Sequence, residues 1–453
     1  MKPALALVAT LALGTTAQQL TDAQIRAVRS RLSDVAKQSW ELGTRAQVLI
    51  EYDAPAFNVL STDCKLPPNT TLSQSQLSAL STPFGIVRPI VTSGGSVSNT
   101  QGNNAGGDGA AASGSLMDDG SAADPASLGV TVALANWTKA DDGGVRYGDA
   151  ARDELNFLLT KAPRSSEGAI SHRTEKVQLW SDFVYMVPPF LAYYGALHSN
   201  TTIMDEAFNQ IRLYRDQLHD GESNNLWKHI VLGGSGEDSG RWSTGNGWAA
   251  MGMLRVLGTY KASSDLGSTY GQSISTLSDW VQEILDGMYA TVENSNTALF
   301  TNYADRPSTF RDASSTALLA AATYRLAVLT DGKYVSRIPD AERARRELSK
   351  YAGDAGGHID GSGWLSPVVD PHNFGQQGEH SPEGQAFVIS MIAAYRDWNG
   401  AGQPGVNAAT SRATASKLYT LVLCFPAVIL YTSIDTSNDR IKAQALEGKQ
   451  ENA

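Results

Sequence analysis

The sequence predicts an all-α fold, a helical toroid or bundle, on three observations. Apolar residues recur at spacings of three and four along most of the chain, as they do in amphipathic helices. Strand-like alternation is scarce, and only residues 85–92 read as a candidate strand. Helix–loop–helix units follow one another without intervening strands, which favours packing of helix on helix.

The expected helices can be read off in order. The first begins at a Thr21-Asp22 cap and carries Ile25, Val28, Leu32 and Val35 at helical spacing. The apolar stretch 168–195 holds another, which we expect Pro188 and Pro189 to break. The remaining helices are expected at about 126–137, 147–159, 202–218, 247–260, 271–289, 312–329, 341–351 and 382–398.

Three segments lie outside this helical pattern. Residues 1–17 have the basic start, apolar run and small-residue end of a secretory signal peptide. Residues 92–123 are rich in Gly, Ser and Ala, and are either a loop over a site or a plain flexible insertion. Residues 401–453 form an extension of uncertain structure, whose apolar run 417–432 is too short to span a bilayer. We therefore expect residues 18–400 to form a single helical domain.

Composition and short motifs limit the classes of binding partner and the cellular compartment that we expect for this protein. The formal net charge of −10 disfavours nucleic acid as a partner, because a phosphate backbone would be repelled. Sequons at Asn69, Asn136 and Asn200 agree with the signal peptide in predicting a secreted glycoprotein with no membrane span. Pairing of Cys64 with Cys424 stays open, since connectivity cannot be read from sequence. The sequence predicts no particular oligomeric state.

The most informative residue is Asp182, which follows Trp180 and precedes Phe183, Tyr185 and Met186. A carboxylate in such surroundings is expected to be desolvated, with a raised pKa suited to a general acid. The alternative is a hydrogen-bonded structural carboxylate in the core.

A second cluster runs from Trp227 to Trp248 and contributes His229, Arg241 and Trp242. Its tryptophans suit stacking on sugar rings, although core packing explains tryptophans equally well. We expect a tight turn at Asn246 that opens the next helix. The histidines are scattered and no metal, nucleotide or serine-hydrolase motif occurs, so no cofactor or metal is expected. Acid–base chemistry in an aromatic cleft, typical of glycosidases, remains.

At these residues the chain resembles a known family. The pattern W-x-D-F-x-Y-M with P-F-L-A-x-Y, a histidine ten residues earlier, a later W-x-x-G-N-G-W and a closing S-x-E-G-Q resemble the unsaturated rhamnogalacturonyl hydrolases. These form glycoside hydrolase family 105 within the six-hairpin glycosidases, and the secreted form resembles fungal members. The resemblance covers about residues 124–398 and implies an (α/α)6 barrel.

The resemblance also implies an activity: removal of a terminal 4,5-unsaturated uronic acid from pectin-derived oligosaccharides, by hydration of the double bond. Asp182 then corresponds to the general acid and Asp124 to a second acid, although Asp124 before Pro125 also fits a helix cap. The residues implied to bind substrate are His172, His229, Arg241, Trp242, Thr244 and Trp248.

Thr244 departs from the family pattern, which has an arginine at this position to grip the uronate carboxylate. A hydroxyl supplies neither charge nor a bidentate fork. Arg241, Lys228 or the backbone of the following turn could replace it. Two other functions therefore stay open: a glycosidase of the same barrel acting on saturated sugars, and a non-catalytic carbohydrate-binding protein.

Overall fold

Two kinds of helix alternate along the chain. Helices such as α1 (Asp22–Val35) and α9 (Gly271–Ala290) bury one stripe of residues and expose the other. Helices such as α8 (Ser243–Ala262) and α10 (Ala313–Leu329) are buried on nearly every side. A helix with one apolar stripe belongs on the outside of a fold and a helix apolar all round belongs inside. The alternation therefore specifies an inner and an outer layer.

The computed structural model describes residues 19–93, 114–139, 143–263, 266–350 and 357–406. Besides those four helices, it contains α2 (Ser39–Asp53), α3 (Gln74–Thr92), the 3-10 helix η2 (Asp124–Leu128), α4 (Gly129–Thr138), α5 (Tyr147–Thr160), α6 (Phe183–Leu197), α7 (Thr201–Leu218), α11 (Ile338–Leu348) and α12 (Pro382–Gly400), with short 3-10 turns η1 (Pro55–Phe57) and η3 (Gly267–Tyr270).

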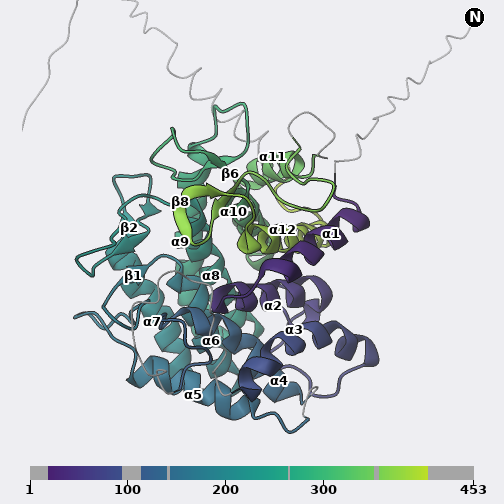
Figure 1. Ribbon diagram of the computed structural model, residues 1–453. Helices are drawn as coiled ribbons and strands as arrows, with labels where there is room; N and C mark the ends of the chain where they lie inside the picture. Colours follow the sequence, from purple (N-terminus) through teal and green to yellow (C-terminus); the bar gives the residue numbers. More distant parts are fainter. Residues whose placement is uncertain (1–18, 94–113, 140–142, 264–265, 351–356, 407–453) are drawn as a thin grey trace, which may run out of the picture. The chain divides into compact units, whose positions relative to one another are not determined.

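The inner helices close into a ring. Going round it, α2 contacts η2, η2 contacts α6, and α6, α8, α10 and α12 follow until α12 returns to α2 (Figure 1). The outer helices α1, α3, α7, α9 and α11 pack against this ring, and α5 packs against α4, which continues η2. The arrangement confirms the predicted all-α fold and the (α/α)6 barrel.

Four antiparallel two-stranded sheets lie at one end of the ring. β1 (Leu179–Trp180) pairs with β4 (Ile230–Val231), and β2 (His219–Asp220) pairs with β3 (Leu226–Trp227). β5 (Phe300–Thr301) pairs with β6 (Arg311–Asp312), and β7 (Val368–Asp370) with β8 (Asn373–Gly378). The strands lie in the loops that lead into the inner helices α6, α8, α10 and α12, so they gather where these helices begin.

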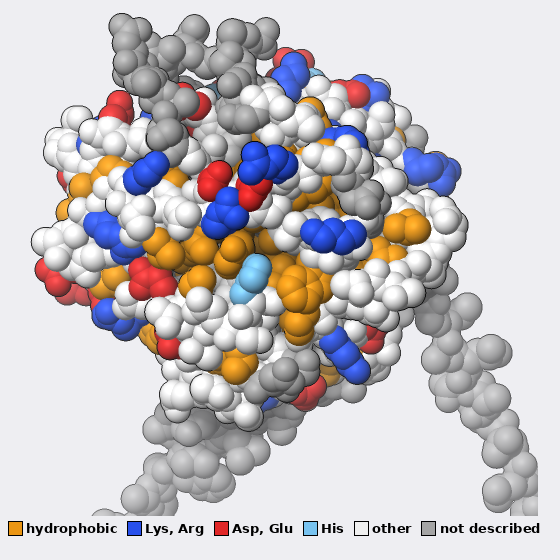
Figure 2. Space-filling view, turned by 90° about the horizontal axis from the view of Figure 1, so that it is seen from below, with side chains coloured by type: hydrophobic (Ala, Val, Ile, Leu, Met, Phe, Trp, Pro, Cys, Tyr) orange, Lys and Arg blue, Asp and Glu red, His pale blue; other side chains and the backbone are white. Residues whose placement is uncertain are grey.

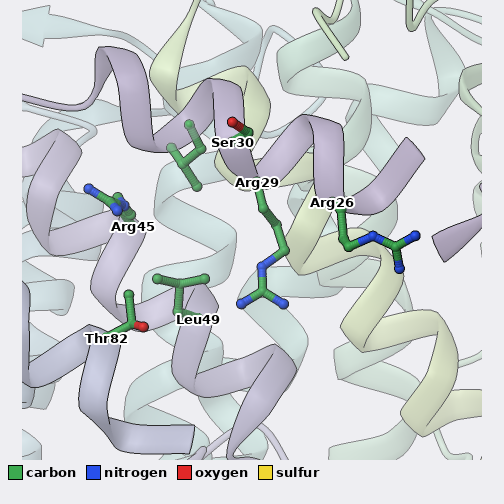
Figure 3. Close-up of a pocket in the computed structure, with 7 residues that line it drawn as sticks. Arg26, Arg29, Ser30, Arg45, Leu49 and Thr82 are labelled. Atoms are coloured by element: carbon green, nitrogen blue, oxygen red, sulfur yellow. The ribbon is translucent and has the colours of Figure 1, made fainter. Parts of the chain in front are cut away.

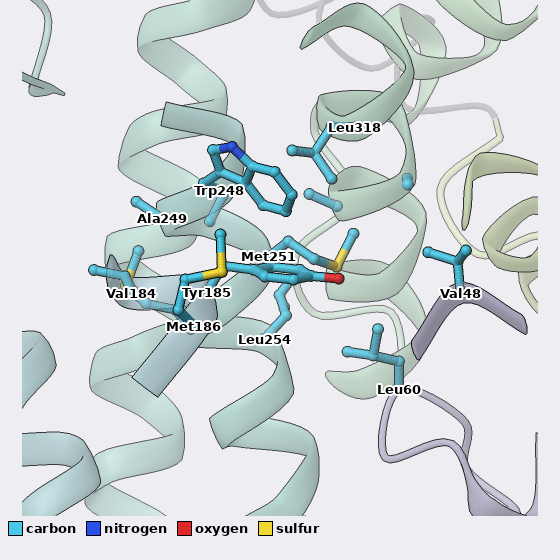
Figure 4. Packing of buried hydrophobic residues seen from close by; sticks show 14 of the residues in the cluster. Val48, Leu60, Val184, Tyr185, Met186, Trp248, Ala249, Met251, Leu254 and Leu318 are labelled. Atoms are coloured by element: carbon cyan, nitrogen blue, oxygen red, sulfur yellow. The ribbon is translucent and has the colours of Figure 1, made fainter. Parts of the chain in front are cut away.

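The core fills the centre of the ring. Figure 4 shows side chains from α2, α6, α8 and α10 meeting there, among them Val48, Tyr185, Trp248 and Leu318. Figure 2 views the molecule from below, away from the strands, where charged side chains of both signs surround an area of hydrophobic ones. Chemistry-bearing side chains are concentrated at the strand end instead.

Three local predictions were wrong. Residues 85–92 belong to helix α3, because their apolar side chains face α2 and α4 and not a sheet. Helix α6 continues through Pro188 and Pro189, held in place by packing against α7 and α8. Helix α8 begins at Ser243, so Asn246 lies in its first turn, with its side-chain amide donating to the backbone carbonyl of Trp227 at 3.0 Å.

Several predictions concern residues outside the described ranges. These are the signal peptide at 1–17, most of the loop at 92–123, Cys424 and the apolar run 417–432. Cys64 is buried, and within the described residues it forms no disulfide. In the part of the chain that the structure describes, no helix is both long and apolar enough to span a bilayer.

Candidate active site

Asp182 lies at the residue that precedes α6, at the strand end of the barrel. The pairing of β1 with β4 brings this segment against residues 229–231, and the Ser181 backbone N–H donates to the His229 carbonyl at 2.8 Å. The Asp182 side chain keeps 14% of its surface exposed. It is therefore enclosed by protein but open on one side.

Two histidine–aspartate pairs form the polar centre of the site. His229 Nε2 lies 3.5 Å from Asp182 Oδ2, and His172 Nε2 lies 3.3 Å from Asp124 Oδ1. Both imidazoles are buried, as is Asp124 in η2. The four residues come from four separate stretches of the chain, and the fold brings the predicted acids and histidines together.

The pKa of Asp182 moves opposite to the prediction. Burial by itself would raise it, but the close contact with His229 and the positive charges of His229 and His172 hold the pKa below its usual value. Burial likewise opposes the charge on His229, yet Asp182 and Asp238 together raise the pKa of that imidazole. In the free site, each group of this pair thus favours the charged form of the other.

Aromatic rings enclose this charged pair. Trp180 stacks on His172 with centroids 4.8 Å apart and planes 9° from parallel, and meets His229 edge-on at 5.6 Å. Trp242 lies 4.5 Å from the His229 ring. Phe374 of β8 meets the same ring at 4.5 Å and 90°. Such walls exclude water and offer flat faces to a sugar ring.

Sequence reasoning missed four residues of this site. Phe374 reaches it from the β7–β8 hairpin, and Asp238 and Tyr303 stand behind His229. Asp119 lies beside Asp124; burial and the charge of Asp124 raise its pKa to about 6. Asp119 was visible as an acid in the 92–123 segment, and Asp238 as a neighbour of His229. Phe374 lies between His372 and His380, in a segment whose sequence fits a turn and a ligand loop equally well, and nothing in the sequence marked Tyr303.

Comparison with known proteins agrees with this geometry. The Glycosyl Hydrolase Family 88 profile matches residues 113–344, more than half of the chain and most of the site. The chain belongs to glycosyl hydrolase family 88. It is a glycoside hydrolase, and an oligosaccharide is its class of substrate. No curated protein matches it.

Solved structures share the fold of this hydrolase. A possible member of the GH105 family from Salmonella enterica serovar Paratyphi A is 17% identical with a TM-score of 0.59, covering 83% of this chain and 93% of its own. A glycosyl hydrolase family 88 protein from Bacteroides vulgatus is 14% identical (TM-score 0.56; 83% and 97% covered). An unsaturated glucuronyl hydrolase from Bacillus sp. GL1 is 15% identical (TM-score 0.51; 84% and 96% covered).

Three of the predicted substrate-binding residues have their side chains buried in the core or held in ion pairs. Trp248 is buried between Tyr185 and Phe387 in the barrel core. Thr244 is buried and donates its hydroxyl to Asp312 Oδ2 at 3.1 Å. Arg241 is ion-paired with Asp220 and with Asp305. In this structure the three side chains are thus engaged in packing, in a hydrogen bond and in ion pairs.

A separate cavity of about 250 Å³ lies between α1, α2 and α3 (Figure 3). Three arginines line it, and Figure 3 shows them pointing in different directions. Arg29 is engaged by Asp53, and Arg45 donates to Ser33 Oγ at 2.7 Å. Neither Asp nor Glu is among the described residues that line this cavity.

Proposed function

We propose that this hydrolase removes the terminal 4,5-unsaturated uronic acid from pectin-derived rhamnogalacturonan oligosaccharides, by acid-catalysed hydration of the double bond. The observation that carries the proposal is the Asp182–His229 pair, open on one side and walled by Trp180, Trp242 and Phe374. A single acid with an aromatic platform suits protonation of an enol ether.

In the proposed reaction, Asp182 donates a proton to C4 of the unsaturated ring. Positive charge develops at C5 and on the ring oxygen, next to the carboxylates of the site. Water then adds at C5, and the hemiketal opens and releases the neighbouring sugar. Because binding of an anionic uronate removes water and adds negative charge, the pKa of Asp182 rises when it must carry the proton.

Asp124 and His172 supply the second acid–base pair. With Nε2 of His172 3.3 Å from its carboxylate, Asp124 is held in one orientation. Trp180 stacks on His172 and also meets His229, so one indole fixes the spacing of both pairs. We assign this pair to orienting the attacking water.

Arg173 is the cation that best fits the uronate carboxylate. It follows His172, and its backbone pairs with Ser121, beside Asp119 and Asp124. In the described part of the chain no carboxylate comes within ion-pair distance of its guanidinium, whereas Arg241 has two. Its charge still acts on Asp119, against the effect of burial and of Asp124. We therefore assign to Arg173 the binding of the uronate carboxylate, for which Thr244 supplies no charge.

We also propose that the enzyme is secreted, as a fungal-type member of its family. The signal-peptide pattern of residues 1–17 and the three sequons support export, the setting in which a pectin-degrading enzyme meets its polymer. Expression of the full chain in a fungal host tests this. Mature protein in the medium that begins near Gln18 is expected, and retention inside the cell would contradict it.

The function is tested by following the ultraviolet absorbance of the conjugated double bond with unsaturated galacturonyl-rhamnose as substrate. Absorbance should fall with the wild-type enzyme, and Asp182→Asn should lower kcat by about 10²- to 10⁴-fold. Asp216→Asn, which alters an exposed carboxylate on α7, is the matched control and should remain active.

Other outcomes point to the alternatives. Full activity of Asp182→Asn would remove this residue from the mechanism. Turnover of saturated sugars alone would indicate an ordinary glycosidase, and sugar binding with no turnover on a broad panel would indicate a binding protein.

A further inference from the structure

A chain of polar contacts continues behind the catalytic pair. Asp182 Oδ2 faces Nε2 of His229, and Nδ1 of His229 lies 3.0 Å from Asp238 Oδ2. The Tyr303 hydroxyl donates to that same Asp238 oxygen at 2.5 Å. His229 is thus held between two carboxylates, one at the open side of the site and one inside its wall.

The backbone fixes this arrangement. Residues Ile230 and Asp238 exchange two backbone hydrogen bonds, of 2.8 and 3.0 Å, and the His229 N–H donates to the Gly240 carbonyl at 3.0 Å. The Gly240 N–H in turn donates to Asp238 Oδ1 at 3.0 Å. The two ends of the loop 230–240 are therefore tied together, and the Asp238 carboxylate is aimed at one ring nitrogen.

The contact with Asp238 determines the tautomer of His229. An ionised carboxylate can only accept hydrogen bonds, so Nδ1 must carry a proton. Tyr303 and His229 both lower the pKa of Asp238, against the effect of its burial, and keep it ionised. The second nitrogen, Nε2, is buried and has no hydrogen-bond partner within the described residues, because 3.5 Å from Asp182 is too long. Nε2 is thus the nitrogen free to gain or lose a proton beside the acid.

We propose that Asp238, supported by Tyr303, is a positioning residue that makes His229 Nε2 the store for the proton delivered to C4 by Asp182. The proposal deepens the function proposed above and rests on it. Asp238 touches no substrate atom in this scheme and acts only through the imidazole.

The protons balance over one turnover. The free site holds an imidazolium at His229 and a carboxylate at Asp182. On uronate binding the proton moves from Nε2 to Asp182 Oδ2, and Asp182 gives it to C4. The Asp182 carboxylate then takes a proton from the water whose oxygen bonds to C5, and returns it to Nε2. The substrate gains one water, and the enzyme ends as it began.

The groups that set the protonation of His229 come from several elements. Asp182 precedes α6, Asp238 belongs to the 230–240 loop, and Tyr303 follows β5. Arg306 lies 3.8 Å from Asp238 Oδ1, and His172 acts on Asp182 through its charge. The carboxylates of Asp182 and Asp238 flank the imidazole, and their effect on His229 exceeds that of these cations and of burial. The pKa of His229 therefore stays above its ordinary 6.5. Activity that depends on the imidazolium is lost as pH rises through that raised pKa.

The test compares Asp238→Asn with Glu237→Gln, its neighbour in sequence. The Glu237 side chain is exposed and accepts a hydrogen bond from the Gly234 N–H. Asp238→Asn removes a negative charge from His229 and should lower kcat at least about 10-fold with little change in KM. The alkaline limb of its pH–rate profile should move to lower pH, by about one unit. Glu237→Gln should keep the wild-type kcat and profile.

Nuclear magnetic resonance of 15N-histidine-labelled wild-type enzyme gives a readout that does not depend on a variant folding, with His229→Gln used for assignment. Neutral His229 should carry its proton on Nδ1 and titrate above 6.5. A proton on Nε2, or titration below that value, would overturn the proposal.

The two proposals fail separately. If Asp182→Asn is inactive while Asp238→Asn keeps the wild-type kcat and alkaline limb, the role of Asp238 is wrong and the function stands. If Asp182→Asn is fully active, the function itself is wrong.

Discussion

At the residue scale, the partner of a side chain decides its chemistry. Aspartates at 182 and 312 are both enclosed at the strand end of the barrel, yet they do different work. Asp312 accepts from the backbone N–H groups of Ser314 and Ser315 and from the Thr244 hydroxyl, so its lone pairs are used to hold α10 in place. Asp182 faces an imidazole across 3.5 Å and keeps an open side. Only the second arrangement leaves a group free to react.

This contrast gives a paired prediction for Thr244 and Arg173. Thr244→Val should cost about 1 kcal/mol of stability, because it deletes a buried hydrogen bond, and leave KM for an unsaturated uronate unchanged. Arg173→Gln should leave stability unchanged and raise KM about 10-fold or more.

Thermal unfolding and steady-state kinetics check the pair. Thr259→Val, which removes another buried hydroxyl on α8, is the control for stability. A large rise in KM for Thr244→Val would show that this hydroxyl holds the carboxylate after all.

At the element scale, close helix contacts override local helix preferences. Pro188 and Pro189 cannot donate backbone hydrogen bonds, yet α6 continues through both. Gly252 of α8 lies so close to α6 that a Cβ there would collide with the Val184 carbonyl. Val184 is the residue whose helical partner would be Pro188. The glycine allows the two inner helices to approach where the proline leaves a carbonyl without its usual donor.

We therefore expect Gly252→Ala to destabilise the enzyme by about 1–3 kcal/mol, since the backbone of α6 must move. Gly85→Ala on α3 is the matched control, because nothing lies within 4 Å of an added Cβ. It should gain up to about 1 kcal/mol from the better helix propensity of alanine. Denaturant unfolding of both variants measures the difference, and an equal effect would disprove the role given to the α6–α8 contact.

At the scale of the whole molecule, a buried ionic network joins inner helices across the ring. Glu51 of α2 pairs with Arg255 of α8 and with Arg325 of α10, and accepts from Ser390 of α12 at 2.8 Å. All four side chains are buried. Distant stretches of sequence therefore meet at one carboxylate, which fixes the relative positions of four inner helices.

Glu51→Gln should accordingly destabilise the enzyme by about 3–5 kcal/mol, because two buried guanidinium groups lose their shared counter-charge. Asp53→Asn, two residues later, breaks a partly exposed pair with Arg29 and should cost about 0–1 kcal/mol. Chemical unfolding monitored by tryptophan fluorescence separates the two cases. Equal losses would show that the barrel does not depend on this network.

The sequence by itself determined the helical class, most helix positions and the choice of Asp182 as the candidate acid. These follow from local spacing. The apolar stripes of α1 and α9 predict two of the helices, and the aromatic neighbours of Asp182 predict an enclosed carboxylate. The resemblance to a family added the barrel and the expected roles.

Tertiary structure alone decided the state and the surroundings of those residues. The pKa of Asp182 falls where burial predicted a rise, because β1–β4 pairing brings in His229 from almost fifty residues away. Phe374 and Tyr303 reach the site from the β7–β8 and β5–β6 hairpins, and Thr244 and Trp248 are buried among core residues. Spacing along the chain encodes which face a helix buries, whereas charge and contact across the ring depend on which segments the closed barrel sets side by side.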